Sequence, residues 1–185
     1  MHVLDAGEIC ESGLLMKTSE AAKARFESLL ERHAGIVRKV AFGYSRNEND
    51  RRDLTQDILL QLWKTYPRYS PDRPFSTWMY RIALNVAISA LRKQSRPGRE
   101  PMPFDESAHD VPHESGDSSR TEERTATLHQ LISECQPLDR ALLLLYLDDC
   151  SYREIGAVLG LSETNVGTKL NRLKQGLRQK LTDKE

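Results

Sequence analysis

Apolar residues in the first half of the chain recur at helical spacing, three or four positions apart, with no long β-branched alternation. This pattern predicts two helices joined near Gly35, a third that ends before Pro67 and Pro71, and a fourth that starts near Phe75. The predicted buried stripes are Phe26, Leu29, Leu30, Val37, Val40, Ala41 and Tyr44 in the first pair, Leu54, Ile58, Leu62 and Trp63 in the third helix, and Trp78, Ile82, Val86 and Leu91 in the fourth.

The second half predicts four short helices, over about 121–135, 138–147, 152–159 and 163–181. Two of them carry the signals of a helix-turn-helix, each with its own physical reason. A serine followed three residues later by glutamate forms a capping box, a left-handed glycine turns the chain, a second serine caps the next helix, and a small residue permits close helix contact. These residues are Ser151, Glu154, Gly160, Ser162 and Gly156, with buried stripes at Ile155, Val158, Leu159, Val166, Leu170, Leu173, Leu177 and Leu181.

Residues 95–120 separate these two halves and have the composition of a flexible linker. They contain half of the chain's eight prolines, six acids and little apolar surface, too little to offset the entropy of ordering. The sequence therefore predicts an all-α protein with two small helical domains, 19–94 and 121–185. Residues 1–18 are expected to be a disordered arm or a mis-annotated start, with Met16 as the other candidate first residue.

The net charge of the chain is zero, but its basic residues are concentrated in two segments, which indicates a class of partner. The 185 residues hold 27 basic and 27 acidic side chains, yet 73–99 has six basic residues and no acid, and 164–182 has five and no acid. Two cationic faces predict two contacts with a polyanion. The longest apolar run, 141–147, is too short for a membrane span and the acidic start is unlike a signal peptide, so a cytoplasmic location is expected.

Polar side chains on the second helix of the predicted helix-turn-helix suit contact with duplex DNA, because short polar groups reach base edges and cations reach phosphates. A solvated basic face on an ordinary helical hairpin is the alternative. In 74–96, aromatic rings alternate with cations, as a single strand or an unpaired base requires, although the rings could equally be core. The outward positions of the second helix are Asn165, Thr168, Lys169, Asn171, Arg172 and Gln175.

Other candidate chemistry is weak. Cys10, Cys135 and Cys150 are odd in number and widely spaced, which favours plain thiols over a zinc or disulfide framework. His109 and His113 have helical spacing, but prolines interrupt their segment, so a metal site there is not expected. No cofactor is predicted.

A metal-dependent nuclease is an alternative of a different class, since it needs clustered carboxylates on a rigid element. Asp50, Asp53 and Asp57 are the only candidates for such a cluster. The neighbouring Arg51 and Arg52 argue against it, because cations beside the ligands oppose metal binding.

Three segments together resemble a known family. DLTQDILLQLWK, then FSTWMYRIALNVAISALRK, then LDRALLLLYLDDCSYREIGAVLGLSETNVGTKLNRLKQGLRQKL are similar to a sigma-70 family RNA polymerase sigma factor of the extracytoplasmic-function (ECF) group. The likeness covers about 22–182 in the expected order. It implies a non-enzymatic initiation factor whose region 2-like domain docks on the polymerase clamp and captures the melted −10 element, and whose region 4-like domain binds the −35 element.

The resemblance also implies site residues and partners. Core RNA polymerase and promoter DNA are the implied partners, with control by an anti-sigma protein or a Ser/Thr kinase left open. The implied polymerase contacts are Asp53, Gln56, Asp57, Leu60 and Trp63. The implied −10 contacts are Phe75, Ser76, Thr77, Trp78, Arg81, Asn85 and Arg92. The implied −35 contacts are Ser162, Thr164, Thr168, Lys169, Asn171 and Arg172.

This chain departs from the family pattern at three places. Asp50-Arg51-Arg52-Asp53 stands where the family commonly has D-A-E-D, which puts two cations in a patch expected to be acidic and predicts weaker polymerase binding. Ser89 replaces a frequent aspartate, and Gly167 replaces a frequent basic residue, so the promoter sequence does not transfer.

The first departure suggests a phosphosite at Thr55. A phosphate there would restore negative charge near what is expected to be a helix N-terminus, where the helix dipole favours it. A tolerated helix residue is the simpler interpretation of Thr55. For the whole chain, the alternative function is a helix-turn-helix regulator that acts without core polymerase, as a dimer on a two-fold site.

Overall fold

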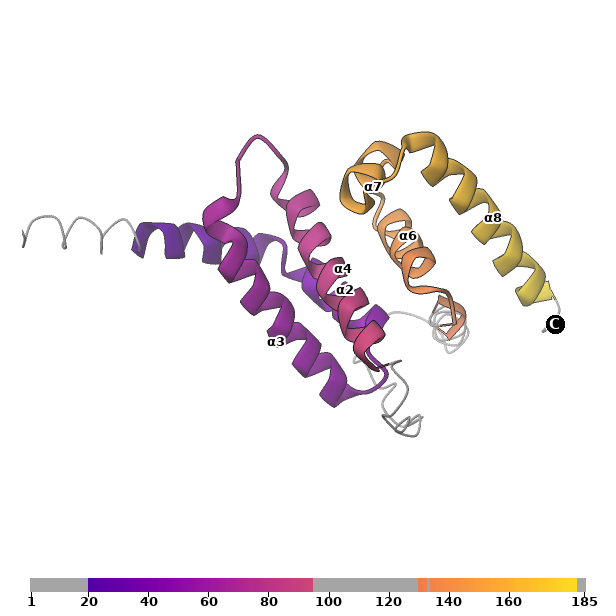
Figure 1. Ribbon diagram of the computed structural model, residues 1–185, viewed down its shortest axis with the longest axis horizontal. Coiled ribbons are helices and arrows are strands. Elements are labelled where there is room, and N and C mark those ends of the chain that lie inside the picture. Colours follow the sequence, from indigo (N-terminus) through magenta and orange to yellow (C-terminus); the bar gives the residue numbers. More distant parts are fainter. Residues whose placement is uncertain (1–19, 95–129, 133, 183–185) are drawn as a thin grey trace, which may run out of the picture. The chain divides into compact units, whose positions relative to one another are not determined.

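The computed structural model describes residues 20–94, 130–132 and 134–182, and these are helical apart from the turns between helices (Figure 1). The expected arm at 1–18 and linker at 95–120 lie outside the described residues. The helices are 20–32, α2 (Ala34–Tyr44), α3 (Glu48–Thr65), α4 (Phe75–Gln94), α6 (Pro137–Leu147), α7 (Tyr152–Leu159) and α8 (Glu163–Thr182), with a 3-10 turn η1 (Tyr66–Arg68) and helical residues at 130–132. The predicted all-α class is confirmed.

The chain forms two compact units, Met1–Ala34 and Gly35–Glu185. The first helix, 20–32, ends at a turn at His33, two residues before the predicted joint. All helices from α3 onward belong to the second unit, including those on both sides of the expected linker. No helix in the described ranges is long and apolar enough to cross a membrane.

Helices α3 and α4 run side by side and contribute many of the buried residues of the first half (Figure 1). Asn47 caps α3, its side-chain oxygen accepting a hydrogen bond from the backbone N–H of Asp50 at 2.8 Å. Phe26 is buried on the first helix, and the buried side chains of α2, α3 and α4 are Ile36, Val37, Val40, Ala41, Tyr44, Leu54, Ile58, Leu62, Phe75, Met79, Tyr80, Ala83, Leu84 and Ala87.

The predicted stripe of α4 is corrected by this packing. Trp78, Ile82 and Val86 are only half-buried, whereas Met79 and Ala83, one position further along, are fully buried. The buried face of α4 therefore contains the small Ala83 and Ala87 as well as Met79 and Leu84. The prediction that Trp63 belongs to the buried stripe of α3 is also wrong, because its side chain is 44% exposed.

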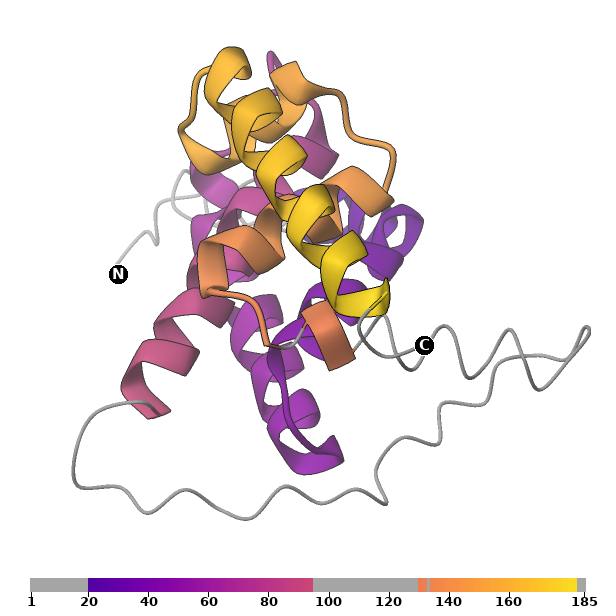
Figure 2. The same ribbon diagram turned by 90° about the vertical axis from the view of Figure 1, so that its right-hand side faces the viewer.

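Helices α6, α7 and α8 contact one another, and Figure 2 shows α8 lying across α6. Their buried residues include Ala141, Leu142, Leu145, Ile155, Val158, Val166 and Leu170. The predicted stripe of α8 is buried only in its first half, since Leu173 and Leu177 are half-buried and Leu181 is 42% exposed. The predicted helix 121–135 is described only from residue 130 and has given way to a turn by residue 134.

Candidate nucleic-acid and protein interface

The predicted helix-turn-helix is present at α7 and α8. Ser151 and Glu154 form the capping box: the Ser151 hydroxyl accepts from the Glu154 N–H at 3.3 Å, and the Glu154 carboxylate accepts from the Ser151 N–H at 2.8 Å. The Ser151 hydroxyl also donates to the Glu154 carboxylate at 2.6 Å, and this bond, together with the one from the Ser151 N–H, lowers the pKa of Glu154. Gly160 then turns the chain with φ of 71°, in the left-handed region that favours glycine.

Gly156 lies in the middle of α7 and faces the backbone of the turn after the helix. A Cβ at this position would be 2.6 Å from the backbone oxygen of Leu161, closer than non-bonded atoms approach. The Leu161 N–H donates to the Gly156 backbone oxygen at 3.0 Å, and this hydrogen bond fixes the position of the turn relative to α7. The predicted need for a small residue at Gly156 is therefore confirmed, and the close neighbour is backbone rather than a side chain.

The predicted −35 contacts lie at the start and along the outer side of α8. The Ser162 hydroxyl caps the helix by accepting from the Asn165 N–H at 3.3 Å. The Thr168 hydroxyl is engaged with the Thr164 carbonyl at 3.0 Å. Lys169 is half-buried and the other five predicted residues are exposed, so α8 presents polar and cationic groups to solvent along one side.

The predicted polymerase contacts form an exposed strip on α3, which we call the α3 face: Asp53, Gln56, Asp57, Leu60 and Trp63. Its two apolar members are among the most exposed large hydrophobic residues in the described part of the chain, Leu60 at 51% and Trp63 at 44%. Large apolar groups rimmed by charge are typical of a protein-binding surface. The strip therefore fits a docking role.

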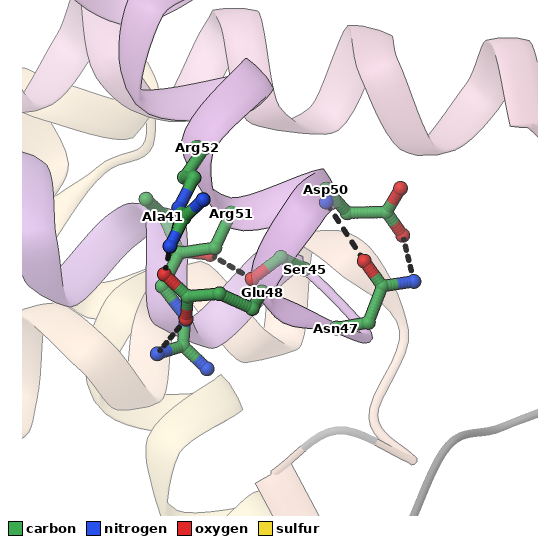
Figure 3. A network of polar contacts seen from close by, with 7 residues as sticks. All are labelled: Ala41, Ser45, Asn47, Glu48, Asp50, Arg51 and Arg52. Carbon is green, nitrogen blue, oxygen red and sulfur yellow. Dashed lines mark hydrogen bonds and ion pairs between the residues drawn. The ribbon is translucent and has the colours of Figure 1, made fainter. Parts of the chain in front are cut away.

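The two arginines that depart from the family pattern are both engaged by Glu48 (Figure 3). Arg51 Nη1 is 3.0 Å from the Glu48 carboxylate and its guanidinium lies 4.7 Å from the ring centre of Phe42. Arg52 Nε is 3.3 Å from the other Glu48 oxygen. The Glu48 carboxylate thus offsets part of the positive charge that the two arginines add, and the Arg51 guanidinium lies over the Phe42 ring. We expect polymerase binding to be weakened less than the sequence pattern suggests.

The structure changes the argument for Thr55. Helix α3 begins at Glu48, so Thr55 lies in its third turn. The favourable effect of a helix N-terminus on negative charge fades after the first turn, and the expected dipole contribution at Thr55 is therefore wrong. Arg51 and Arg52 lie one turn before Thr55 along the helix, so their charges are the remaining reason to consider a phosphate.

The predicted −10 contacts occupy α4. Arg81, Asn85 and Arg92 are exposed and are spaced four and seven residues apart, which puts them on one side of the helix. Trp78 is half-buried on the same side. Phe75 is only 6% exposed, so its ring is part of the core and packs beside the half-buried ring of Trp78.

Tyr66 and Tyr69, which are absent from the predicted −10 contacts, complete an aromatic cluster at the start of α4. The Tyr69 ring centre is 5.3 Å from that of Phe75 and 5.1 Å from that of Trp78, and Tyr66 stacks on Tyr69 at 6.1 Å. The Tyr69 hydroxyl donates to the Arg73 carbonyl at 2.9 Å, which holds the loop before α4. The segment YPRYSPDRPF contains the sequence pattern that indicates this cluster, because two tyrosines precede Phe75 in a short proline-rich loop.

Cysteine and metal chemistry has little support among the residues that the structure describes. Cys135 and Cys150 are half-buried free thiols, and burial raises the pKa of each. In the described ranges no three His, Cys, Asp or Glu side chains come together as metal ligands. His109, His113 and Cys10 lie outside them.

Family models match both halves of the chain. Sigma-70 region 2 matches residues 29–97, and sigma-70 region 4 matches residues 125–177. Among curated relatives, RNA polymerase sigma factor CarQ of Myxococcus xanthus is 30% identical over 171 residues, 90% of this chain and 94% of CarQ. ECF RNA polymerase sigma factor SigE of Mycolicibacterium smegmatis is 30% identical over 166 residues, which is 88% of this chain but 63% of SigE.

Two solved structures share the fold. CnrH in complex with the cytosolic domain of CnrY has a TM-score of 0.65 at 23% identity, over 90% of this chain and 96% of that one. The sigma factor RpoE in complex with the anti-sigma factor NepR, from Bartonella quintana, has a TM-score of 0.68 at 20% identity, over 85% of this chain and 97% of that one.

Proposed function

This chain belongs to the sigma-70 family of RNA polymerase sigma factors, in its ECF group, and from that premise we propose how its surfaces divide the work of promoter recognition. Such a factor is not an enzyme; it binds core RNA polymerase and directs the start of transcription. We infer that it acts in the cytoplasm, where its polymerase and promoter are. The observation that carries the proposal is that three suitable surfaces lie on three separate helices, α3, α4 and α8.

The α3 face is assigned to core polymerase, because it combines exposed Leu60 and Trp63 with the acids Asp53 and Asp57. Helix α4 is assigned to the melted −10 strand, because its exposed cations lie on one side with the aromatic cluster at its start. Helix α8 is assigned to the −35 duplex as the recognition helix of the helix-turn-helix.

In vitro transcription tests this assignment as a whole. The purified chain is mixed with bacterial core polymerase and a promoter library, and the transcript starts are sequenced. We expect starts downstream of asymmetric two-part promoters that depend on the added chain. A chain that gives no transcripts, while another sigma factor activates the same polymerase, and that binds two-fold duplex sites alone, would favour a regulator that acts without polymerase.

We also propose that an anti-sigma protein holds the factor inactive. The solved structure of RpoE contains the anti-sigma factor NepR, and that of CnrH contains the cytosolic domain of CnrY. Both structures share the fold of this chain over most of its length. A partner that covers the α3 face would block polymerase directly. Co-purification from cells with the parent chain, compared with a variant in which Leu60 is changed to lysine, would identify a protein that uses this face.

Trp78→Ala is expected to reduce the yield of open complexes at least about fivefold. Base stacking on an aromatic side chain contributes about 1–3 kcal/mol, and Trp78 is the half-buried ring that adjoins the exposed Arg81. Permanganate reactivity of unpaired thymines at saturating polymerase measures the effect. Trp78→Phe, which keeps a ring face, serves as control and should retain most of the activity. Equal open-complex yield from the alanine variant would exclude Trp78 from strand capture.

We propose Thr55 as a regulatory phosphosite, with Arg51 and Arg52 as its neighbouring cations. Thr55 is half-buried on α3 and lies three residues from Arg52 and two from Asp57, next to the α3 face. Thr55→Ala should lower promoter activity in cells while leaving transcription by the unmodified purified chain unchanged. Equal activity of parent and Thr55→Ala in cells would rule the site out.

A further inference from the structure

Gly167 is a glycine that the packing of α8 does not require. Among the described glycines only Gly160 has a positive φ, so the backbone at Gly167 has ordinary helical geometry. A Cβ at Gly167 would lie 3.4 Å from Cε2 and 3.7 Å from Cδ2 of Tyr152, whereas a Cβ at Gly156 would lie 2.6 Å from a backbone oxygen. The first two distances are ordinary van der Waals contacts. Because glycine inside a helix lowers its stability relative to alanine, the fold alone supplies no reason for a glycine at 167.

The Tyr152 ring lies against α8 at the point where a side chain at 167 would begin. Tyr152 is the first residue of α7, and its side chain is half-buried. The two atoms that face Gly167, Cδ2 and Cε2, are both ring carbons. Since Gly167 has no side chain, its position leaves these ring carbons uncovered. We call the two ring carbons and the Gly167 backbone the ring-edge surface.

The ring-edge surface lies among the predicted −35 contacts of α8. Residues three and four apart are neighbours on a helix, so Gly167 adjoins Thr164 on one side and Asn171 on the other. Both neighbours are exposed, as is Thr168, the next residue along the chain. The Thr168 hydroxyl donates to the Thr164 carbonyl at 3.0 Å, which leaves the Thr168 methyl group for outside contacts. The ring-edge surface is therefore an apolar spot beside the polar side of α8.

The chemistry of this surface matches one feature of the DNA major groove. Guanine, adenine and cytosine present hydrogen-bond donors and acceptors there, whereas thymine also presents its 5-methyl group. Ring carbons and the CH₂ of a glycine offer neither a donor nor an acceptor, and apolar side chains are the usual contacts of a thymine methyl group. A long or polar side chain at 167 would cover the ring carbons and exclude the methyl group.

We propose that Tyr152 and Gly167 determine the sequence specificity of the helix-turn-helix at one base pair, where the Tyr152 ring contacts the 5-methyl group of a thymine in the −35 duplex. This inference rests on the proposed function, because it needs α8 in the major groove of the −35 element. It goes further by assigning a base contact to a residue of α7 and by naming the base. Tyr152 is absent from the predicted −35 contacts, which all belong to α8 or to its cap, Ser162.

Replacing thymine by deoxyuridine tests the methyl contact directly, because the two nucleotides differ only in that group. Holoenzyme made from core polymerase and the full chain first selects its −35 sequence from a randomised promoter library. Each thymine of the selected element, on either strand, is then replaced singly, and competition binding measures the affinity of the holoenzyme. At one position we expect a loss of about fourfold, the change that corresponds to burial of one methyl group.

Gly167→Lys tests whether this loss depends on the uncovered ring. The lysine stem can lie along the ring carbons while its ammonium reaches solvent, and no side chain is truncated. The added positive charge maintains overall DNA affinity, whereas the effect of deoxyuridine should disappear.

Gly176→Lys is the matched control for charge. It adds the same side chain to α8 nine residues further on, two and a half turns away and therefore on the opposite side of the helix. No atom outside its own helix lies within 4 Å of a Cβ at this position. Gly176→Lys should therefore leave the effect of deoxyuridine unchanged.

Two substitutions at Tyr152 separate the ring from the hydroxyl. Tyr152→Phe keeps the ring and should keep the effect of deoxyuridine, whereas Tyr152→Ala removes the ring and should lose it. Hydrogen exchange of residues 152–182 checks that α7 and α8 remain folded in each variant. If Tyr152→Ala unfolds them, Gly167→Lys still tests the contact, because it leaves the ring and the core in place.

Three results would overturn the thymine contact: a parent holoenzyme that no single deoxyuridine weakens, an effect of deoxyuridine that persists in Gly167→Lys, or an effect that Tyr152→Phe abolishes. The last of these would assign the contact to the tyrosine hydroxyl. Failure of the proposed function looks different, because the parent chain then forms no holoenzyme that selects a two-part promoter, and the thymine contact fails with it.

Discussion

Changing both Leu60 and Trp63 to alanine is expected to lower the affinity for core polymerase at least 100-fold. Sigma-dependent transcription should be lost at concentrations of the chain at which the parent just saturates core polymerase. These residues are 51% and 44% exposed on α3, so the change removes interface area while leaving the core intact. A tryptophan at the centre of an interface commonly contributes about 2 kcal/mol or more, equivalent to about 30-fold in the dissociation constant, and the leucine adds to it. Titration of labelled core polymerase measures the loss.

Gln61→Ala is the matched control for this surface, because Gln61 is exposed on α3 and is not part of the α3 face. It should bind polymerase as the parent does. Thermal unfolding of both variants should stay close to that of the parent, since neither truncates a buried side chain. A double variant that binds polymerase normally would show that α3 is not the docking helix, even though the chain belongs to the sigma-70 family.

Charge on α3 is expected to modulate this docking, but less than the sequence alone implied. The sequence pattern counted Arg51 and Arg52 as two cations added to an acidic patch. In the structure Glu48 holds both, and Arg51 also lies over the Phe42 ring. Pairing three and four residues apart along a helix is a general rule, but which carboxylate an arginine selects depends on rotamers and on the neighbouring helix.

The helix-turn-helix could be predicted almost residue by residue because its signals are local. The capping box at Ser151, the left-handed Gly160 and the small Gly156 each act within a few residues, and all three are as expected. The predicted start of the next helix near Phe75 is also confirmed, since α4 begins at Phe75.

The rest of the site depends on tertiary packing, which periodicity alone does not determine. On α4 the helical spacing is compatible with several buried faces, and packing against α3, α6 and α7 buries the face that contains Ala83 and Ala87. Tyr66 and Tyr69 belong to the aromatic cluster only because the loop folds back over Trp78. The contact from Arg140 to Gly43 joins residues 97 positions apart, and no local pattern predicts such a pair.

Gly156→Ala is expected to destabilise the helix-turn-helix by about 2–3 kcal/mol and to weaken −35 binding in parallel. The added methyl would lie 2.6 Å from the Leu161 oxygen. That oxygen belongs to a backbone that cannot swing aside, because the Leu161 and Gly160 N–H groups both donate to the Gly156 oxygen, at 3.0 and 2.9 Å. Relief requires α7 and α8 to move apart, and forced overpacking of this kind costs about 1–3 kcal/mol.

Hydrogen exchange is the suitable measurement, because both tryptophans, Trp63 and Trp78, lie outside α7 and α8 and their fluorescence would not report on them. Peptides from 152–182 should exchange faster in Gly156→Ala, and a −35 duplex should bind more weakly.

Gly176→Ala is the matched control on α8. No atom outside its own helix lies within 4 Å of the added methyl, so this change should slow exchange, by about 0.5–1 kcal/mol of helix stability. The same substitution at two glycines, twenty residues apart, thus has opposite expected signs because one faces the turn backbone and the other faces open space. If Gly156→Ala also slows exchange, then the turn tolerates a Cβ and the close contact of α7 with α8 does not determine how the recognition helix is held.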